Sequence, residues 1–417
     1  MLIALVNSIA CRYSSSWFAS AYITLRRVLA RHRPTPVVTR LPSAAIHHVC
    51  VFFALGSTGN AQNPGMGDVL LRNFFLKMLT DRYPVARISL VAGPKLLKRH
   101  GSLLLRHCYA HELIACPEVG AAPLSAWLDF FRRMSSRYFD LCIIDPESIT
   151  VRALHACLCG VPERVGFPDD SSEQGFLTST VVPGPFEGPY PDILAATRSW
   201  ARAIGFELPN NTDFTPLFVF APEPELLPHL PAPAVAVHVG GDRKWNRRWP
   251  LEKYAQLCDR LCSEAGASIY LVGDASDSPE CEHVRAHVIA NHPLARISNV
   301  SGVTLNQTAN YLSRAVLFVG NDSGPMHIAG ALGRPVVVPV GPTFPHLWKR
   351  AYRAQIICMD PSCFLNDTPD DRHEVRRISC STFQCPYAFD PENPLYPRCL
   401  NAIPVEAVWN VAITHLK

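Results

Sequence analysis

The chain has 417 residues, a formal net charge of +4, 48% hydrophobic residues and 18% charged residues. This composition excludes a disordered chain, and the length favours two domains over one. No apolar run reaches the roughly 20 residues of a membrane span. Beyond the N-terminus no block of basic residues suggests a nucleic-acid partner.

The N-terminal segment is basic. The first 67 residues contain six arginines and no Asp, Glu or Lys. Residues 16–34 place apolar side chains on one helical stripe and Arg26, Arg27 and Arg31 opposite it. This pattern predicts an N-terminal extension over residues 1–45 whose amphipathic helix lies on the inner face of the cytoplasmic membrane. A helix packed on its own domain and an extension upstream of the true start codon remain alternatives.

The cysteines indicate a reducing compartment. The chain has 15, and several lie within apolar segments, among them Cys50, Cys142 and Cys258. Scattered thiols of this kind are typical of packing residues in a cytoplasmic protein rather than a secreted disulfide framework. The N-terminus also lacks the basic start and apolar core of a secretory signal.

The first half of the chain alternates strands and helices. The pattern predicts strands over residues 49–56, 86–93 and 139–146 and an amphipathic helix within residues 65–84. Apolar strands separated by helices are typical of a parallel sheet covered on both faces. We therefore predict an N-terminal Rossmann-like domain over residues 46–208, followed by a proline-rich linker over 209–233.

The alternation restarts after the linker, and predicts a second Rossmann-like domain over residues 234–417. Strands are predicted at 234–240, 268–274, 316–322 and 335–341, with helices at 249–266, 305–315 and 324–333. Each strand is followed by glycine or acidic residues, at the edge where open α/β sheets bind ligands. The predicted fold is α/β, with two Rossmann-like domains facing each other across a cleft.

One strand-to-helix junction in the second half stands out. Asp322, Ser323, Gly324 and Pro325 follow an apolar strand and open a small-residue helix that contains His327. Free backbone N–H groups and the positive end of the helix dipole favour a phosphate there, whereas the Asp322 carboxylate suits sugar hydroxyls. The alternative is an ordinary helix cap beside a buried histidine.

The same stretch carries a family resemblance. The run VGNDSGPMHIAGALGRPVVVPVGPTFP resembles the signature of glycosyltransferase family 9, the bacterial ADP-heptose:lipopolysaccharide heptosyltransferases. Three further segments resemble family motifs in the family's order, and the resemblance covers residues 48–408. These segments are GMGDVLLRNFFLKMLTDRYPVARI, GVPERVGF and NRRWPLEKYAQL.

The resemblance implies a GT-B fold and a metal-independent, inverting transfer of heptose from ADP-heptose to a glycan or lipid-linked acceptor, such as the lipopolysaccharide core. Asp68 matches the family's general base, which removes the proton of the acceptor hydroxyl. Arg247 aligns with a lysine beside the diphosphate, and arginine can grip phosphate oxygens at two points. Lys244 is the alternative cation, and Asp68 could equally be a helix cap.

Further donor-binding residues follow from the same comparison. Asp274 and Asp277 are equal candidates for accepting the ribose hydroxyls. Gly302 and Val303 lie in a segment that resembles the family's adenine-side loop. Ser323, Gly324, Pro325 and His327 are expected at the diphosphate, and Asp322 at the sugar.

The C-terminal segment is rich in cysteine. Cys363, Cys380, Cys385 and Cys399 could hold a structural zinc ion, but they lack the closely spaced pairs typical of zinc knuckles, so free thiols remain the alternative. Catalysis itself is expected to need no cofactor.

Other functions stay open at this stage. The same fold could transfer another nucleotide-activated sugar, use a protein or small-molecule acceptor, or bind a nucleotide sugar without catalysis. Asp68, Asp322 and His327 are all present, which favours an active enzyme. A cytoplasmic location, with peripheral contact to the membrane, is expected.

Overall fold

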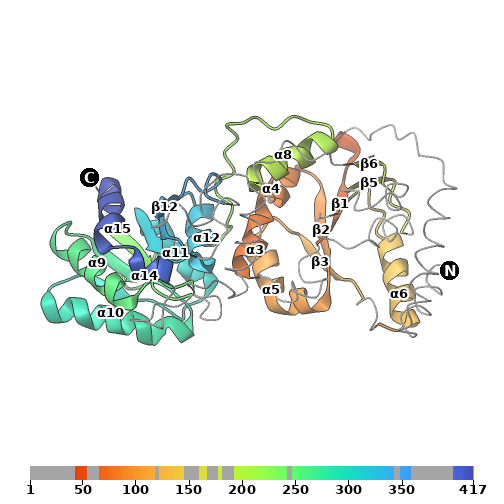
Figure 1. Ribbon diagram of the computed structural model, residues 1–417. Helices are drawn as coiled ribbons and strands as arrows, with labels where there is room; N and C mark the ends of the chain where they lie inside the picture. The colour runs from red at the N-terminus through yellow and green to blue at the C-terminus, as the bar shows by residue number, and fades with distance from the viewer. Residues whose placement is uncertain are drawn as a thin grey trace. The chain divides into compact units, whose positions relative to one another are not determined.

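The computed structural model describes residues 43–53, 65–117, 122–144, 159–166, 177–180, 192–241, 247–341, 348–357 and 398–416. The chain forms two compact units, drawn in Figure 1. Unit 1 comprises Met1–Gly184 and Thr197–Phe214, and unit 2 comprises Pro185–Ala196 and Thr215–Lys417.

Unit 1 is built on a six-stranded parallel sheet in the order β3-β2-β1-β4-β5-β6. The strands are β1 (His48–Phe52), β2 (Arg87–Ala92), β3 (Glu112–Ala115), β4 (Leu141–Ile144), β5 (Glu163–Gly166) and β6 (Ser179–Thr180). The helices that accompany them are α3 (Met66–Leu71), α4 (Asn73–Arg82), α5 (Pro94–His107), α6 (Leu124–Ser135) and α8 (Ile193–Ala203).

Unit 2 contains a second six-stranded parallel sheet, in the order β12-β11-β10-β7-β8-β9. Its strands are β7 (Ala234–His238), β8 (Ser268–Leu271), β9 (Ile297–Asn299), β10 (Leu317–Gly320), β11 (Val336–Pro339) and β12 (Gln355–Ile357). Its α-helices are α9 (Leu251–Ser263), α10 (Ser278–Asn291), α11 (Leu305–Arg314), α12 (Gly324–Ala331), α14 (Arg398–Ala402) and α15 (Val405–Ala412).

Both sheets have the same connectivity. In each, the first strand of the unit lies beside the fourth, so the strand order reverses between β1 and β4 in unit 1 and between β7 and β10 in unit 2. Such a reversal leaves the loops at the carboxyl ends of the two central strands free to hold a ligand. The prediction of two parallel-sheet α/β domains is confirmed.

The two faces of the unit 2 sheet carry different helices. Val235, Val237 and Val239 pack into a buried core with side chains of α9, α10 and α15. Because successive side chains of a strand point to opposite faces, Ala236 and His238 project to the other face, where α11 and α12 lie. His238 thus lies at the carboxyl end of β7, on the sheet face that α11 and α12 cover.

Two details differ from the sequence-based expectation. The single helix expected within residues 65–84 is interrupted at Arg72, next to the fully buried Asn73, whose side-chain oxygen accepts a hydrogen bond from Tyr109 N at 3.0 Å. The proline-rich segment is also fixed in part. Leu217 N donates to Ala331 O at 2.7 Å, and Asn310 of α11 accepts a hydrogen bond from Glu223 N at 2.7 Å.

Membrane-spanning helices are absent from the part of the chain that the structure describes. The amphipathic N-terminal helix predicted for residues 16–34 lies outside the described residues.

Candidate functional site

The carboxyl edge of the unit 2 sheet brings together most of the predicted donor-binding residues. Arg247 follows β7, Asp274 and Asp277 follow β8, Gly302 follows β9, and Asp322 follows β10. The loops after β8 and β9 touch, because Gly302 N donates to Gly273 O at 3.0 Å. The sequence therefore predicted correctly that these residues share one edge.

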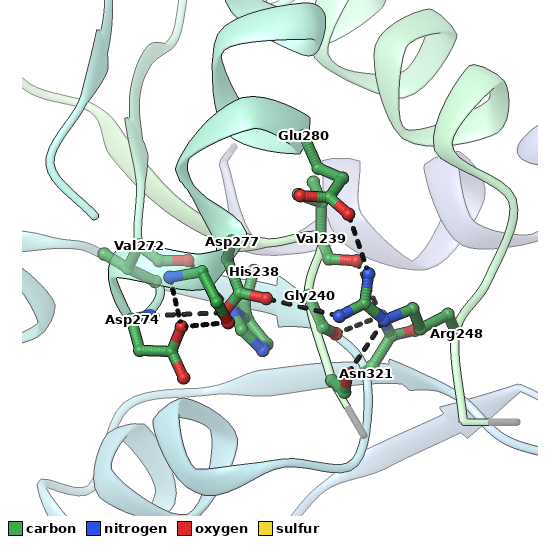
Figure 2. A network of polar contacts seen from close by, with 11 residues as sticks. His238, Val239, Gly240, Arg248, Val272, Asp274, Asp277, Glu280 and Asn321 are labelled. Carbon is green, nitrogen blue, oxygen red and sulfur yellow. Dashed lines mark hydrogen bonds and ion pairs between the residues drawn. The ribbon is translucent and has the colours of Figure 1, made fainter. Parts of the chain in front are cut away.

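Asn321 ties the two central strands of this edge together. Its side chain is fully buried, and its amide nitrogen donates to Val239 O at 3.1 Å and Gly240 O at 2.7 Å. Its amide oxygen accepts from Trp249 N and from the Tyr254 hydroxyl, both at 2.9 Å. These four hydrogen bonds of one side chain fix the end of β7, the end of β10 and the start of α9. Figure 2 shows Asn321 beside Val239 and Gly240.

Arg248 also fixes the loop between β7 and α9, through contacts with the loop itself and with acidic residues at the start of α10. Its Nε donates to Gly241 O at 2.8 Å, and its guanidinium pairs with Glu280 at 3.1 Å and with Asp277 at 3.4 Å (Figure 2). The side chain is only 16% exposed. Arg248 therefore holds the loop in shape, a role that the neighbouring Arg247 does not share.

Arg247 has a different environment. Its Nε is buried without a hydrogen-bond partner, and no ion pair of this side chain occurs among the described residues. A guanidinium with an unsatisfied donor beside a ligand-binding edge suits an anionic group such as a diphosphate. Lys244, the alternative cation, lies outside the described residues.

The two aspartates after β8, which the sequence treated as equivalent, differ in the structure. Asp277 is 5% exposed, forms an ion pair with Arg248 and accepts a hydrogen bond from Asp274 N at 3.1 Å. A Cβ at Gly240 would lie 2.0 Å from the Asp277 carboxylate, so the glycine makes room for it. Asp277 therefore has a structural role at this edge.

Asp274, by contrast, is exposed and caps the short 3-10 helix Ala275–Asp277. One carboxylate oxygen accepts hydrogen bonds from Ser276 N at 2.7 Å and from the Ser276 hydroxyl at 2.6 Å. The hydrogen bond from the Ser276 side chain is the main reason that the pKa of Asp274 lies below its ordinary value. The Asp274 carboxylate also accepts a hydrogen bond from the backbone of Asp277, and because the residue is exposed it remains accessible to a ligand hydroxyl.

The loop after β9 is a tight turn. Gly302 has a φ of 80°, a left-handed conformation that favours glycine, and a Cβ there would lie 3.4 Å from the backbone of Ala275. Val303 is half-buried, and Thr304 then caps α11 by accepting a hydrogen bond from Gln307 N at 3.2 Å.

Asp322 and His327 are paired at the start of α12. Both side chains are 7% exposed, and His327 Nε2 lies 3.4 Å from an Asp322 oxygen. His327 Nδ1 lies 3.4 Å from the hydroxyl of Tyr352, whose ring packs so closely on α12 that a Cβ at Gly330 would come within 2.4 Å of it. Tyr352 and the carboxylate thus fix the imidazole from both sides, which the sequence did not reveal.

Ser323, Gly324 and Pro325 form the entry to α12. Ser323 is the N-cap, but its hydroxyl donates to Asn321 O at 3.1 Å instead of capping the helix. Gly324 and Pro325 are the first helical residues, and proline suits this position because it lacks a backbone donor. No side-chain cap occupies the end of this helix, which agrees with the predicted anion site.

Asp68 lies in unit 1, in the first turn of α3 after the carboxyl end of β1. It is exposed, and one oxygen accepts a hydrogen bond from Gly65 N at 2.8 Å. The other oxygen has no partner among the described residues. The side chain therefore caps the helix, as the alternative interpretation proposed, and still offers an oxygen to an acceptor hydroxyl.

The C-terminal cysteines are mostly beyond the described residues, which include Cys399 but neither Cys363, Cys380 nor Cys385. Cys399 is half-buried, and its sulfur lies 3.3 Å from where a Cβ at Gly341 would be. The described part of the chain contains no cluster of His, Cys, Asp and Glu that could hold a metal ion. The zinc prediction stays untested.

Comparison with known proteins agrees with this geometry. The model of glycosyltransferase family 9 (heptosyltransferase) matches residues 127–369, more than half of the chain. The chain is 26% identical to lipooligosaccharide heptosyltransferase 2 of Haemophilus ducreyi, in an alignment that covers 67% of this chain and 82% of the relative.

Solved structures show the same fold. The ADP-heptose lps heptosyltransferase II of E. coli has a TM-score of 0.56 at 20% identity, covering 89% of this chain and 98% of that one. A family 9 glycosyl transferase from Veillonella parvula has a TM-score of 0.59 at 19% identity, covering 90% and 98%. These structures confirm the GT-B fold predicted for the chain.

Proposed function

The chain belongs to glycosyltransferase family 9, and from this premise we propose that it transfers heptose from ADP-heptose to a hydroxyl of the lipopolysaccharide core or a related surface glycan. The observation that carries the proposal is the donor-binding edge of unit 2. There the unpartnered Nε of Arg247, the exposed carboxylate of Asp274 and the paired Asp322 and His327 follow three neighbouring strands of one sheet.

The names of similar proteins support this donor and this class of acceptor. The relative in Haemophilus ducreyi is a lipooligosaccharide heptosyltransferase, and the solved E. coli protein is an ADP-heptose lps heptosyltransferase. Both names describe those proteins, and their donor and acceptor are proposed here for this chain.

The donor-binding residues divide by the part of the nucleotide sugar that they suit. The guanidinium of Arg247 and the N-terminus of α12 face the diphosphate, where they neutralise the charge that develops on the leaving group. Asp322 accepts hydrogen bonds from heptose hydroxyls, and His327 contacts the diphosphate. Asp274 accepts the ribose hydroxyls through its exposed carboxylate.

Asp68 is the proposed general base. Its free carboxylate oxygen removes the proton of the acceptor hydroxyl as that oxygen bonds to the anomeric carbon. The bond between that carbon and the diphosphate oxygen breaks, and ADP leaves with the bonding electron pair. Attack from the face opposite the leaving group inverts the anomeric configuration. No metal takes part in the proposed reaction, because Arg247 and the end of α12 supply the positive charge.

The proposed acceptor also gives a location. A lipid-linked glycan acceptor places the reaction at the inner face of the cytoplasmic membrane, which the basic N-terminal segment would contact.

A screen of nucleotide sugars by mass spectrometry tests the proposal. Purified protein should consume ADP-heptose, by transfer or slow hydrolysis, in preference to UDP- and GDP-sugars. A preference for another nucleotide sugar would overturn the donor, and failure to consume any of them with a core-glycan acceptor present would favour a non-catalytic binding protein.

A further inference from the structure

His238 is a buried histidine that the proposed donor site does not yet use. It is the last residue of β7 and is 2% exposed. Its Cα is the register partner of Gly320 across the central strand pair, and a Cβ at Gly320 would lie 3.0 Å from the Cβ of His238. The glycine thus leaves room for an imidazole at the reversal of strand order, where this fold binds ligands.

One ring nitrogen of His238 is committed to the protein. Nδ1 lies 2.9 Å from Val272 O, and since a carbonyl only accepts, Nδ1 carries the proton and donates it. Nε2 has no hydrogen-bond partner among the described residues. The second ring nitrogen is therefore available to a ligand at this edge.

The surroundings of the ring select the chemistry of that partner. Burial lowers the pKa of His238, although the nearby Asp277 and Asp274 act in the opposite direction. Arg248 neutralises Asp277, which leaves Asp274 as the open carboxylate beside the ring. A neutral imidazole protonated at Nδ1 presents a lone pair at Nε2. A lone pair beside a carboxylate repels phosphate and suits a donor of hydrogen bonds.

From this geometry, and resting on the proposed function, we propose that His238 Nε2 accepts a hydrogen bond from a ribose hydroxyl of the bound nucleotide (Figure 2). The ribose then lies between His238 at the end of β7 and Asp274 in the loop after β8. The diphosphate extends toward Arg247 and the start of α12. Under this proposal, His238 determines specificity for the ribonucleotide part of the donor.

Two substitutions separate this role from a merely structural one. In His238→Asn the amide N–H can still donate to Val272 O, but the acceptor at the Nε2 position is lost. In His238→Gln the longer amide can place its oxygen near the Nε2 position. His48→Asn in unit 1 is the control, since it removes a half-buried imidazole that, unlike His238, is hydrogen-bonded at both nitrogens.

Calorimetry with ADP, 2′-deoxy-ADP and 3′-deoxy-ADP gives the readout. His238→Asn should bind ADP about three- to tenfold more weakly than wild type, the usual effect of one neutral hydrogen bond. For the analogue that lacks the paired hydroxyl, wild type and His238→Asn should bind with equal affinity. His238→Gln should recover part of the preference for ADP, and His48→Asn should bind all three as wild type does.

The wild-type chain provides a second readout that requires no variant to fold. In histidine-selective nitrogen-15 spectra, ADP should shift one unprotonated ring nitrogen, and one of the deoxy analogues should not. Unchanged ADP binding by a folded His238→Asn, an equal loss for all three nucleotides, or spectra without such a shift would overturn the role of His238. If wild type binds no ADP at all, the proposed donor itself is wrong.

Discussion

The two units share a strand order, but their described polar networks lie at opposite edges of the sheet. In unit 1 the network gathers at the amino ends of the strands, around His48 and Glu112. In unit 2 it gathers at the carboxyl ends, around Asn321 and Arg248. Because this fold binds ligands at the carboxyl edge, the same topology serves stability in one network and supports the candidate binding site in the other.

The amino-edge network of unit 1 connects three strands. His48 Nε2 lies 2.9 Å from the Ser89 hydroxyl, which donates to Glu112 at 3.0 Å, and Arg137 pairs with Glu112 at 2.8 Å. These groups satisfy one another and leave no open atom for a ligand. The carboxyl-edge network of unit 2 instead holds the loops that carry Arg247 and Asp322, two of the proposed donor-binding residues.

The largest expected effect concerns the one predicted catalytic residue of unit 1. Asp68→Asn should lower kcat by about 10²- to 10⁴-fold, the contribution of a positioned general base, because the amide cannot take the acceptor proton. The variant should fold and bind ADP as wild type does, since the proposed ADP site lies in unit 2. Near-normal turnover would leave Asp68 only its helix-capping role. Unit 1 would then have no proposed catalytic residue to compare with the site of unit 2.

The carboxyl-edge network should be the more sensitive of the two to loss of a single side chain. Asn321→Ala leaves two carbonyls, one N–H and one hydroxyl without partners, and should lower the free energy of unfolding by about 2–4 kcal/mol. Urea titration measures this loss. The exposed Asn291→Ala is the control, with a change within about 0.5 kcal/mol. Equal effects of the two substitutions would refute the special role of Asn321.

Asp322→Ala should separate the sugar from the nucleotide. Only the intact donor presents hydroxyls to this carboxylate, so binding of a non-hydrolysable ADP-heptose analogue should weaken by about 1.5–3 kcal/mol, or roughly ten- to a hundredfold. Binding of ADP should change much less. Calorimetry with both ligands decides, and equal losses would mean that Asp322 acts only by holding His327.

The amino-edge network should contribute a smaller, pH-dependent stability. The hydrogen bond from Arg137 is the main cause of the lowered pKa of Glu112, so its contribution is present above the ordinary pKa of 4.5 and is lost as the pH falls through the lowered value. Glu112→Gln should cost about 0.5–1 kcal/mol at neutral pH, and this difference should vanish in acid. ADP binding should stay unchanged, and an effect on it would contradict the separation of the two edges.

Chelation should have the smallest effect. Treatment with EDTA should leave transfer activity intact, because in the proposed reaction Arg247 and the end of α12 take the role of a divalent ion at the diphosphate. Restoration of a dead, dialysed enzyme by Mg²⁺ would count against this mechanism. Slow unfolding under a strong chelator, with activity intact beforehand, would instead support the zinc site predicted at the C-terminal cysteines.

The strands and helices that the sequence predicted are those with a strong pattern. Buried strands such as β7 and β10 are apolar runs followed by glycine, and both lie where they were expected. Strand β9 has only three residues, and α10 has no clear apolar stripe, so neither produced a signal. A short strand depends on its neighbours for its conformation, and that dependence is not written in the local sequence.

The site shows the same limit. The sequence located the edge but not which of two similar neighbours faces a ligand. Arg247 and Arg248 are adjacent, yet one is held by two carboxylates and the other keeps an unpartnered Nε. Asp274 and Asp277 divide in the same way. Tertiary contacts decide such pairs, since residues distant in sequence, such as Asp277 and Glu280, hold Arg248 and not Arg247.

The packing of Asp277 against two glycines has a consequence for engineering. Its carboxylate fills the space that a Cβ would need at Gly240, and a Cβ at Gly273 would come within 2.8 Å of it. The three positions, together with Arg248, therefore behave as one inseparable part. Transplanting the loop after β7 into another GT-B scaffold without the matching loop after β8 would bring either a steric clash or an unpaired guanidinium. A successful graft has to carry both loops at once.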